Sequence, residues 1–314
     1  MSKIKVAIIA GGLSSEREVS LRSGRAVQAA LEGDKYAVTF YDPLTELKAL
    51  IENKDSIDIA FPLLHGRYGE DGCIQGLLKI LDIPFVGSSV LASAMAMNKK
   101  VAKEMYRRGG LDVARDVIIR RGAHWNASEV VTALGHEVMV KPATEGSSYG
   151  ISLCRGEEEI QAGVEQALDL DEEVLVEEYI KGKEVTCCVL GRRELEVLPL
   201  VEIRPSSSHP FFTYDAKYIP GASDEICPAP LDDETRKRVE EYGKTAHRLL
   251  HCRAWSRTDM IIAEDRIVVL ETNTIPGMTE NSLFPLAART AGLSLAGLVD
   301  RLIQLSLEDS ADSW

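Results

Sequence analysis

The sequence has no apolar run long enough to cross a membrane, because no window approaches the roughly 18 residues that a spanning helix needs. The apolar run at residues 4–10 is also too short for the core of a secretory signal. Lysine and arginine nowhere cluster with aromatic residues, and a net charge of −13 would repel a phosphate backbone. We therefore expect neither a membrane nor a nucleic acid as partner, and a cytoplasmic protein.

Cysteine is also scarce, with six residues and no C-x-x-C pair. The adjacent Cys187 and Cys188 would point to opposite faces of a strand, and we interpret all six as reduced and mostly buried. What the chain does contain is typical of a folded globular protein, with 45% hydrophobic and 27% charged residues. Its 314 residues are enough for two or three packed units.

The first ninety residues predict a parallel, doubly wound α/β sheet, because strands alternate with helices. Ligands of such sheets bind beyond the carboxyl ends of the strands, where the glycine-containing loops 11–16 and 65–72 both fall. The predicted strands are residues 4–10, 36–41 and 57–64, and the predicted helices are residues 16–31 and 44–53.

The rest of the chain predicts α+β structure. A helical region to about residue 108 is followed by short strands and helices. The irregular stretch 204–230 holds five prolines, and a loop of that length is usually a lid or a binding loop. The predicted strands are 117–119, 137–141, 151–155 and 174–178, the predicted helices are 157–168 and 232–251, and a hairpin is expected at 255–263 and 267–271.

The hairpin carries the most informative polar residues. Arg257 and Asp259 lie two apart and share a face, and Glu271 and Asn273 do the same on the second strand. The oxygen atoms of Asp259, Glu271 and Asn273 suit Mg²⁺, which takes a few protein oxygens and completes its shell with water and phosphate. The alternative is a cross-strand ion pair between Arg257 and Glu271 on a solvated face.

The segment after the hairpin indicates an anion site. Gly277 offers a backbone N–H beside a helix that should begin near Ser282, and Arg257 would supply a cation for a developing oxyanion. The alternative is an ordinary turn in which Ser282 caps the helix.

Two further segments fit a nucleotide. Lys141 ends a buried strand before a loop with glycines and serines, which could surround phosphates without the Walker spacing. Residues 177–184 could hold an adenine by backbone and a ribose by carboxylates. The alternatives are a plain hairpin turn with Lys141 at the surface and a solvated charged turn.

Five motifs, in order along the chain, resemble those of the D-alanine–D-alanine ligase family of ATP-grasp enzymes. They lie at residues 11–20, 64–72, 141–150, 216–218 and 271–279. The resemblance implies an ATP-grasp fold in which an N-terminal parallel doubly wound domain is followed by two α+β domains that sandwich ATP. The implied domains are residues 1–93, 94–180 and 181–314, with a lid loop at about 205–228.

The resemblance also implies the activity and the residue roles. The family joins two D-alanines through an acyl phosphate, using ATP and two Mg²⁺ ions, with Mn²⁺ as an alternative, for cell-wall precursors in the bacterial cytoplasm, usually as a homodimer. The implied catalytic residues are Glu16, Ser147, Tyr218, Arg257 and Gly277; His65, Ser282 and Leu283 bind the substrate; Lys99, Lys141, Glu177, Ile180, Glu184 and Lys217 bind ATP; and Asp259, Glu271 and Asn273 bind the metal. Closure of the lid would link Tyr218 through Ser147 to Glu16.

The sequence departs from the family at two positions, Asn98, where relatives can carry aspartate, and Glu178, where some carry lysine. Two alternative functions stay open. One is a relative that accepts D-lactate or another D-amino acid second, which Tyr218 disfavours. The other is a non-catalytic ATP-binding module, which should have lost one of the four polar hairpin residues.

The net charge does not argue against ATP, because eleven acidic residues against two lysines at 157–184 are expected on the outer surface.

Overall fold

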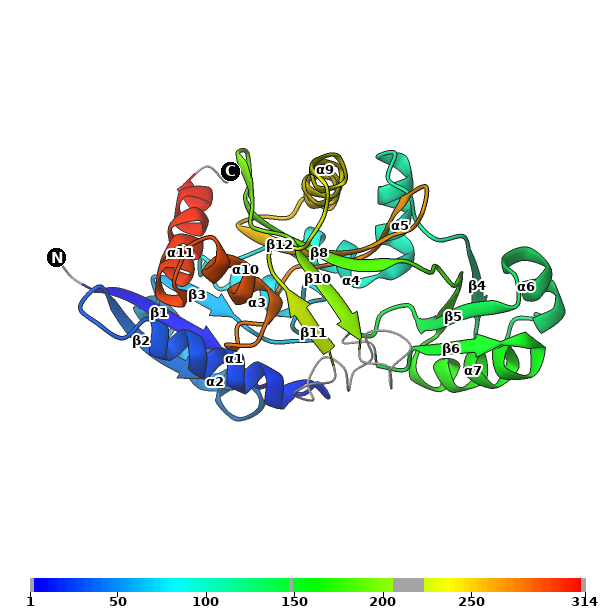
Figure 1. Cartoon of the computed structure of the whole chain (residues 1–314). Coiled ribbons are helices and arrows are strands. Elements are labelled where there is room, and N and C mark those ends of the chain that lie inside the picture. Colours follow the sequence, from blue (N-terminus) through cyan, green and yellow to red (C-terminus); the bar gives the residue numbers. More distant parts are fainter. Residues whose placement is uncertain (1–2, 147–148, 206–222, 312–314) are drawn as a thin grey trace.

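The computed structural model describes residues 3–146, 149–205 and 223–311. These residues form three β-sheets that follow one another along the molecule. The N-terminal sheet and the four-stranded sheet lie at opposite ends, and the six-stranded sheet lies between them (Figure 1). This order leaves the four-stranded and six-stranded sheets next to each other, where the main cleft forms.

The N-terminal sheet is parallel, as predicted. Its strand order is β2 (Tyr36–Tyr41), β1 (Ile4–Ile9), β3 (Ile59–Pro62), so β1 is central. Alternate β1 residues enter different cores: Val6 and Ile8 join one cluster, and Ala7 and Ile9 join another. The first helices along the chain are α1 (Arg17–Ala30), α2 (Pro43–Glu52), α3 (Cys73–Ile80), α4 (Val90–Met97) and α5 (Lys99–Arg108). Of these, α4 and α5 contact the six-stranded sheet.

The four-stranded sheet is antiparallel, in the order β4 (Asp116–Arg120), β7 (Glu173–Glu178), β5 (Glu137–Pro142), β6 (Ser152–Arg155). One face packs on α6 (Ala127–Leu134) and α7 (Gly156–Leu170) through apolar side chains such as Val140 and Val176. Met139, Lys141 and Glu177 alternate with these residues and line the cleft on the other face.

The six-stranded sheet is also antiparallel. Its order is β11 (Ser223–Ile226), β10 (Val201–Pro205), β8 (Lys183–Gly191), β12 (Trp255–Ile262), β13 (Ile267–Asn273), and β9 (Leu195–Val197) pairs with β8. Helix α9 (Asp233–Leu249) packs against β8 and β12. Cys187 and Cys188 lie in different hydrophobic clusters, so the prediction that they face opposite ways is confirmed. All six cysteines are free, and Cys73 is exposed.

The last two helices return to the N-terminal sheet. Helix α10 (Leu283–Thr290) packs on β8, and α11 (Leu295–Ala311) packs on α1 and β3 (Figure 1). A single hydrophobic cluster therefore spans the N-terminal sheet, the six-stranded sheet and both helices. None of the helices described here is long and apolar enough to cross a membrane.

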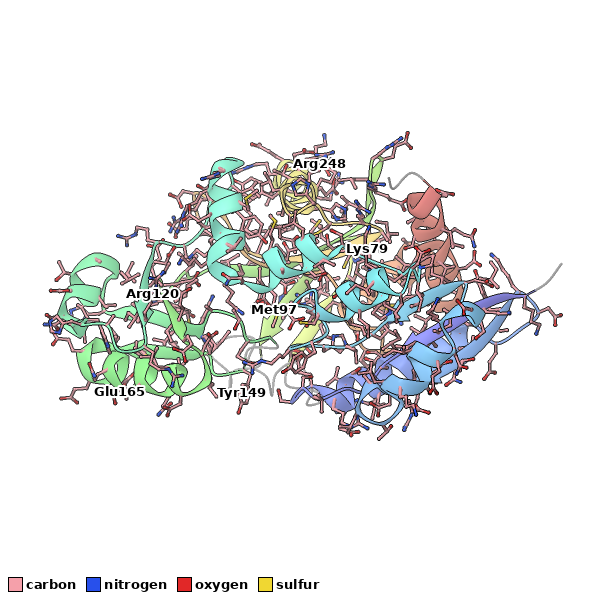
Figure 2. The ribbon with its side chains drawn as sticks, turned by 180° about the vertical axis from the view of Figure 1, so that it is seen from behind. Lys79, Met97, Arg120, Tyr149, Glu165 and Arg248 are labelled. Atoms are coloured by element: carbon pink, nitrogen blue, oxygen red, sulfur yellow. The ribbon has the colours of Figure 1, made fainter. Side chains whose placement is uncertain are left out.

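Three expectations need correction. The stretch 204–230 is not irregular throughout, because β10 extends to Pro205 and β11 pairs with it. The acidic residues at 157–184 are not all peripheral. Those of α7 are exposed, and Glu165 lies at the outer edge (Figure 2), but Glu177 and Glu178 are buried. Finally, α3, α6, α11 and strands β9–β11 were not predicted, and β8 was expected only as a strand through Cys187 and Cys188, without bounds.

Candidate active site

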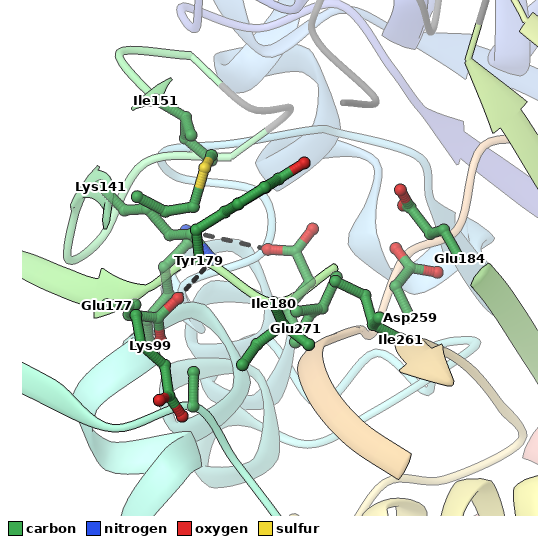
Figure 3. A pocket seen from close by; sticks show the side chains of 14 residues that line it. Lys99, Lys141, Ile151, Glu177, Tyr179, Ile180, Glu184, Asp259, Ile261 and Glu271 are labelled. Atoms are coloured by element: carbon green, nitrogen blue, oxygen red, sulfur yellow. Dashed lines mark ion pairs between the residues drawn. The ribbon is translucent and has the colours of Figure 1, made fainter. Parts of the chain in front are cut away.

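An open cleft of about 810 Å³, including its mouth, lies between the four-stranded and six-stranded sheets (Figure 3). Charged side chains share its lining with apolar ones, which suits a ligand with a flat apolar part and a charged part. The lining residues are Lys99, Ala114, Met139, Lys141, Ile151, Glu177, Glu178, Tyr179, Ile180, Glu184, Asp259, Ile261, Leu270 and Glu271. Every described residue that we expected to bind ATP is among them.

Lys141 and Glu177 form an ion pair inside this cleft, with Nζ 2.5 Å from Oε2 (Figure 3). Burial alone would raise the pKa of Glu177, but the charges of Lys141 and Lys103 outweigh it and hold that pKa at about 2. Lys141 does not reach the surface as in a plain hairpin turn, and Glu177 is not on a solvated turn. These two parts of the alternatives are therefore wrong, whereas β5 and β6 do form an antiparallel hairpin, and Lys181, within residues 177–184, is exposed.

Lys99 begins α5 and joins the cleft to a second cavity. Its Nζ lies 3.9 Å from Oε2 of Glu271 and donates to the backbone oxygen of Glu145 at 2.5 Å. The second cavity, about 330 Å³, shares Lys99 and Glu271 with the first and also contacts Asn273 and Gly146. Asn98 accepts from the backbone N–H of Val101 as the helix cap, a role that aspartate fills equally well.

The hairpin β12–β13 brings the four expected polar residues together. Asp259 lies opposite Glu271, and Arg257 lies opposite Asn273. Arg257 does not form the cross-strand ion pair with Glu271 that was the alternative for this hairpin. Its Nε and Nη2 atoms instead donate to the Asp259 carboxylate at 3.0 and 2.8 Å. Thr186 donates to the same carboxylate at 2.5 Å. Burial would lower the pKa of Arg257, but the Asp259 charge raises it above its usual range.

The donor set of this hairpin fits a hard cation such as Mg²⁺. Two carboxylates, Asp259 and Glu271, face each other, and the amide of Asn273 is next along the strand. The Nδ2 atom of Asn273 is buried without a hydrogen-bond partner among the described residues, so the amide is not held in one orientation by that atom. In the described part of the chain, no three His, Cys, Asp or Glu side chains lie close enough together to hold a metal ion. The amide of Asn273 and a bound phosphate would therefore have to complete the coordination shell.

Three loops meet at Glu16. Its carboxylate is buried, and a Cβ atom added to Gly66 or Gly146 would lie 2.7 or 2.9 Å from its Oε2 atom. Glu16, in loop 11–16, therefore lies next to Gly66 of loop 65–72 and Gly146 of the loop after Lys141, as predicted. Glycine is required at Gly66 also because its φ is +68°.

Two titratable groups beside Glu16 have shifted pKa values. Burial, assisted by the charge of Arg257, lowers the pKa of His65 to about 4, so the imidazole is neutral at pH 7. Burial and the charge of Glu16 raise the pKa of Glu70 to about 8, although Glu70 accepts from the backbone N–H of Gly66 at 2.8 Å. Arg257 is thus within electrostatic reach of the N-terminal loops.

The segment after β13 has the expected form of a strand, a turn and a helix. Ser282 immediately precedes α10, but its side chain does not cap the helix. Instead the Ser282 hydroxyl accepts from the backbone N–H of Thr279 at 3.1 Å, and it lies next to Gly277, where an added Cβ would be 2.9 Å away. Leu283 is buried at the first position of α10.

Three predicted site residues, Ser147, Lys217 and Tyr218, lie outside the described residues. Sequence reasoning missed two buried charged residues near the site, Glu70 and Lys103. The spacing of Lys103, four residues after Lys99 on one helix, was the available signal.

A cleft between two antiparallel sheets, with lysines on one side and paired carboxylates on the other, defines the ATP-grasp class of ligases. Residues 105–304 match the family model for the D-ala D-ala ligase C-terminus, and residues 43–88 match that for the D-ala D-ala ligase N-terminus. The chain belongs to the D-alanine–D-alanine ligase family.

Proteins of this family match the chain over almost its whole length. The D-alanine–D-alanine ligase of Syntrophobacter fumaroxidans is 50% identical over 98% of this chain and 99% of its own, and that of Desulfotalea psychrophila is 48% identical over 98% and 96%. The structure of the Bacillus anthracis D-alanine–D-alanine ligase complexed with ATP superposes with a TM-score of 0.87 at 32% identity, covering 98% of this chain and 99% of the other. The VanG D-Ala:D-Ser ligase of Enterococcus faecalis gives 0.84 at 33% identity, covering 97% and 99%.

Proposed function

We propose that the protein uses ATP to join two D-alanine molecules into D-alanyl-D-alanine through a D-alanyl phosphate, releasing ADP and phosphate for peptidoglycan precursor synthesis. The observation that carries the proposal is that the two cavities are adjacent. Lys99 and Glu271 line both, so the nucleotide cleft lies next to a space bordered by Gly146 and Asn273. A phosphate at this junction would be next to a carboxylate substrate held near Glu16.

The chemistry explains why these residues are needed. A carboxylate is a poor electrophile, so ATP must first convert it to an acyl phosphate that an amine can attack. Lys99 and Lys141 would bind the phosphates, while Glu177, Ile180 and Glu184 would hold the adenosine.

The amino acid sites would lie around Glu16, which is next to Gly146 at the border of the second cavity. Glu16 would accept from the ammonium of the first D-alanine, with neutral His65 beside it. Ser282 and Leu283 would fix the carboxylate of the second. Arg257 and the N–H of Gly277 would stabilise the oxyanion of the tetrahedral intermediate.

Asp259, Glu271 and Asn273 would hold Mg²⁺, two ions in the family's usual arrangement, with Mn²⁺ as an alternative. When bound, the metal would neutralise charge on the phosphates. Arg257 now pairs with Asp259, so the guanidinium must share this carboxylate with the metal or turn toward the substrate.

Further parts of the proposal concern the whole protein. We assign residues 1–93, 94–180 and 181–314 to three domains and residues near 205–228 to a lid, in which Lys217 would reach the ATP and Tyr218 would act through Ser147. We also propose a homodimer in the bacterial cytoplasm.

The proposal is tested by incubating the purified protein with ATP, Mg²⁺ and D-alanine while phosphate and dipeptide are measured. We expect D-alanine-dependent ADP formation and an equal amount of D-alanyl-D-alanine. ADP formation that does not depend on D-alanine, or none at all, would contradict the proposal and favour a non-catalytic ATP-binding module. The presence of all four polar hairpin residues argues against such a non-catalytic module.

A second candidate is a ligase that takes another second substrate, because the VanG D-Ala:D-Ser ligase shares the fold at 33% identity. The 50% identity to a D-alanine–D-alanine ligase favours D-alanine. Competition of D-alanine against D-serine and D-lactate, across pH, decides between them, and preferential formation of a mixed product would overturn our choice.

A further inference from the structure

A buried lysine that the proposed mechanism does not use lies behind the nucleotide cleft. Lys103 is on α5, one helical turn after Lys99, and only 2% of it is exposed. Its Nζ lies 2.8 Å from Oδ1 of Asp116 on β4 and forms an ion pair with Oε1 of Glu177 on β7. Lys103 does not line the cleft, so it is not placed to touch a nucleotide directly.

The two oxygens of Glu177 thus bind different lysines. Oε1 pairs with Lys103 on the side away from the cleft, and Oε2 pairs with Lys141, which lines the cleft. All three side chains are almost completely buried, as is that of Asp116, to which Arg107 also donates. Two lysines therefore balance the charge of Glu177, and one of them, Lys103, does not line the cleft.

This arrangement matters because the Glu177 carboxylate and the phosphates of ATP would compete for the ammonium group of Lys141. It is paired with Glu177 here, and Glu271 and Glu184 also act on it electrostatically. The phosphates of ATP would require the same ammonium group. If Lys141 were the only counter-ion of Glu177, its movement toward phosphate would leave a buried carboxylate uncompensated, which is strongly unfavourable.

We propose that Lys103 is a positioning residue for nucleotide binding: it is the permanent counter-ion of Glu177, and it thereby releases Lys141 to bind the phosphates of ATP. The inference rests on the proposed function, in which the cleft binds ATP. It assigns to Lys103 an effect on phosphate affinity, whereas a merely structural pin between α5 and β7 would affect every ligand of the cleft equally.

The experiment compares Lys103→Met, Glu177→Gln and the double variant with the wild-type protein. Lys100→Met is the matched control, because Lys100 is on the same helix and pairs with Glu173 of the same strand at 3.3 Å, but at a more exposed position. Dissociation constants for ADP and for adenosine are measured by titration calorimetry without D-alanine, and kcat and KM for ATP and D-alanine by steady-state kinetics.

We expect Lys103→Met to weaken ADP binding and raise KM for ATP about ten-fold, the effect of losing one charge-assisted contact. Adenosine affinity should fall less than ADP affinity, because Glu177 keeps Lys141 as its partner when no phosphate competes for that ammonium. The kcat and the KM for D-alanine should stay within about two-fold. In the Glu177→Gln background, Lys103→Met should add less than about two-fold, because the carboxylate that it balances is gone. Lys100→Met should behave like the wild type.

Equal weakening of ADP and adenosine, unchanged ADP affinity, or a full ten-fold loss in the Glu177→Gln background would each overturn the inference. If Lys103→Met does not fold, Lys103→Gln, which removes the charge but keeps a hydrogen-bond donor, takes its place in the same comparison. Failure of the proposed function is a separate result, because it would appear as absent D-alanine-dependent turnover in the wild type.

Discussion

Glu271 borders both cavities and has no role in the hydrophobic core, which makes it the sharpest residue for testing the metal site. Its side chain is 26% exposed. We expect Glu271→Gln to lower kcat at least about 100-fold, since the amide is a weaker metal ligand, with little change in melting temperature. Steady-state kinetics and thermal unfolding measure the two effects.

The matched control for this change is Glu264→Gln at the exposed tip of the same hairpin. It alters the same charge and should leave kcat unchanged. Normal turnover in Glu271→Gln would refute its assignment as a metal ligand. A large fall in melting temperature would instead assign Glu271 a structural role.

The lowered pKa of His65 predicts how the free energy of unfolding depends on pH. Burial lowers its pKa in the folded protein to about 4, below the usual 6.5. The unfolded chain therefore binds more protons between these values, and the contribution of His65 is full above pH 6.5 and is lost as pH falls toward 4. The shift corresponds to about 3 kcal/mol of unfolding free energy.

We expect His65→Gln to reduce the loss of stability between pH 7 and pH 4.5, as measured by urea unfolding at each pH. His124→Gln, at an exposed position, is the control and should follow the wild type. An identical pH dependence in His65→Gln and the wild type would contradict this origin of acid sensitivity.

The residues of the site differ in how well their places could be predicted. Asp259, Glu271, Arg257 and Asn273 share a face because strand geometry repeats every two residues, and this periodicity is visible in the sequence. Asp259 was expected on the same face as Arg257, but their ion pair was not predicted, because Thr186, which donates to the same carboxylate, comes from the separate strand β8. Lys103 was missed for the same reason, since a lysine is expected at the surface unless tertiary structure supplies its counter-ions.

At the scale of elements, local periodicity predicted the N-terminal sheet and the β12–β13 hairpin well. It gave no bounds for β8, which is buried almost throughout and so lacks an alternating pattern, and it missed α11, whose partners α1 and β3 are distant in sequence. Long-range packing decides both, and a single sequence does not reveal it.

The contact of α9 with β8 offers a test at this scale. A Cβ atom added to Gly243 would lie 2.3 Å from Sγ of Cys187 and 2.9 Å from its Cβ. Alanine is favoured in a helix by about 1 kcal/mol, but we expect the clash to dominate and Gly243→Ala to lower the unfolding free energy by about 1–3 kcal/mol. Urea unfolding measures the change.

Cys187→Ala removes the sulfur that causes the closest clash, so the double variant should be more stable than the sum of the two single changes predicts. Simple additivity would show that the packing of Gly243 on Cys187 does not limit the approach of the helix.

For the whole molecule, the distribution of charge matters more than its total. The exposed acidic residues of α7 contribute to the net charge of −13, but the cleft itself is also lined by more carboxylates than lysines: Glu177, Glu178, Glu184, Asp259 and Glu271 against Lys99 and Lys141. Bulk salt screens charges more than about 10 Å away, so an anion in the cleft responds mainly to these side chains. The two lysines alone do not balance the carboxylates, and binding of ATP there would also need Mg²⁺ held by Asp259 and Glu271.

The cluster that joins the N-terminal sheet to the six-stranded sheet predicts that these parts unfold together. Trp255 of β12 contacts Phe61 of β3 and Phe284 of α10, with ring centroids 6.2 and 5.2 Å apart. Leu302 of α11 is 0% exposed within the same cluster. We expect Leu302→Ala to cost about 2–5 kcal/mol through lost burial and the cavity that remains.

Because this cluster is shared, calorimetry of Leu302→Ala should show the transition of both sheets moved together to lower temperature. Glu308→Ala, at an exposed position on the same helix, is the control and should leave the transition in place. A new, separate transition at low temperature in Leu302→Ala would mean that the N-terminal sheet unfolds independently, and that the contacts around Trp255 do not couple the loop carrying Glu16 to the hairpin carrying Arg257.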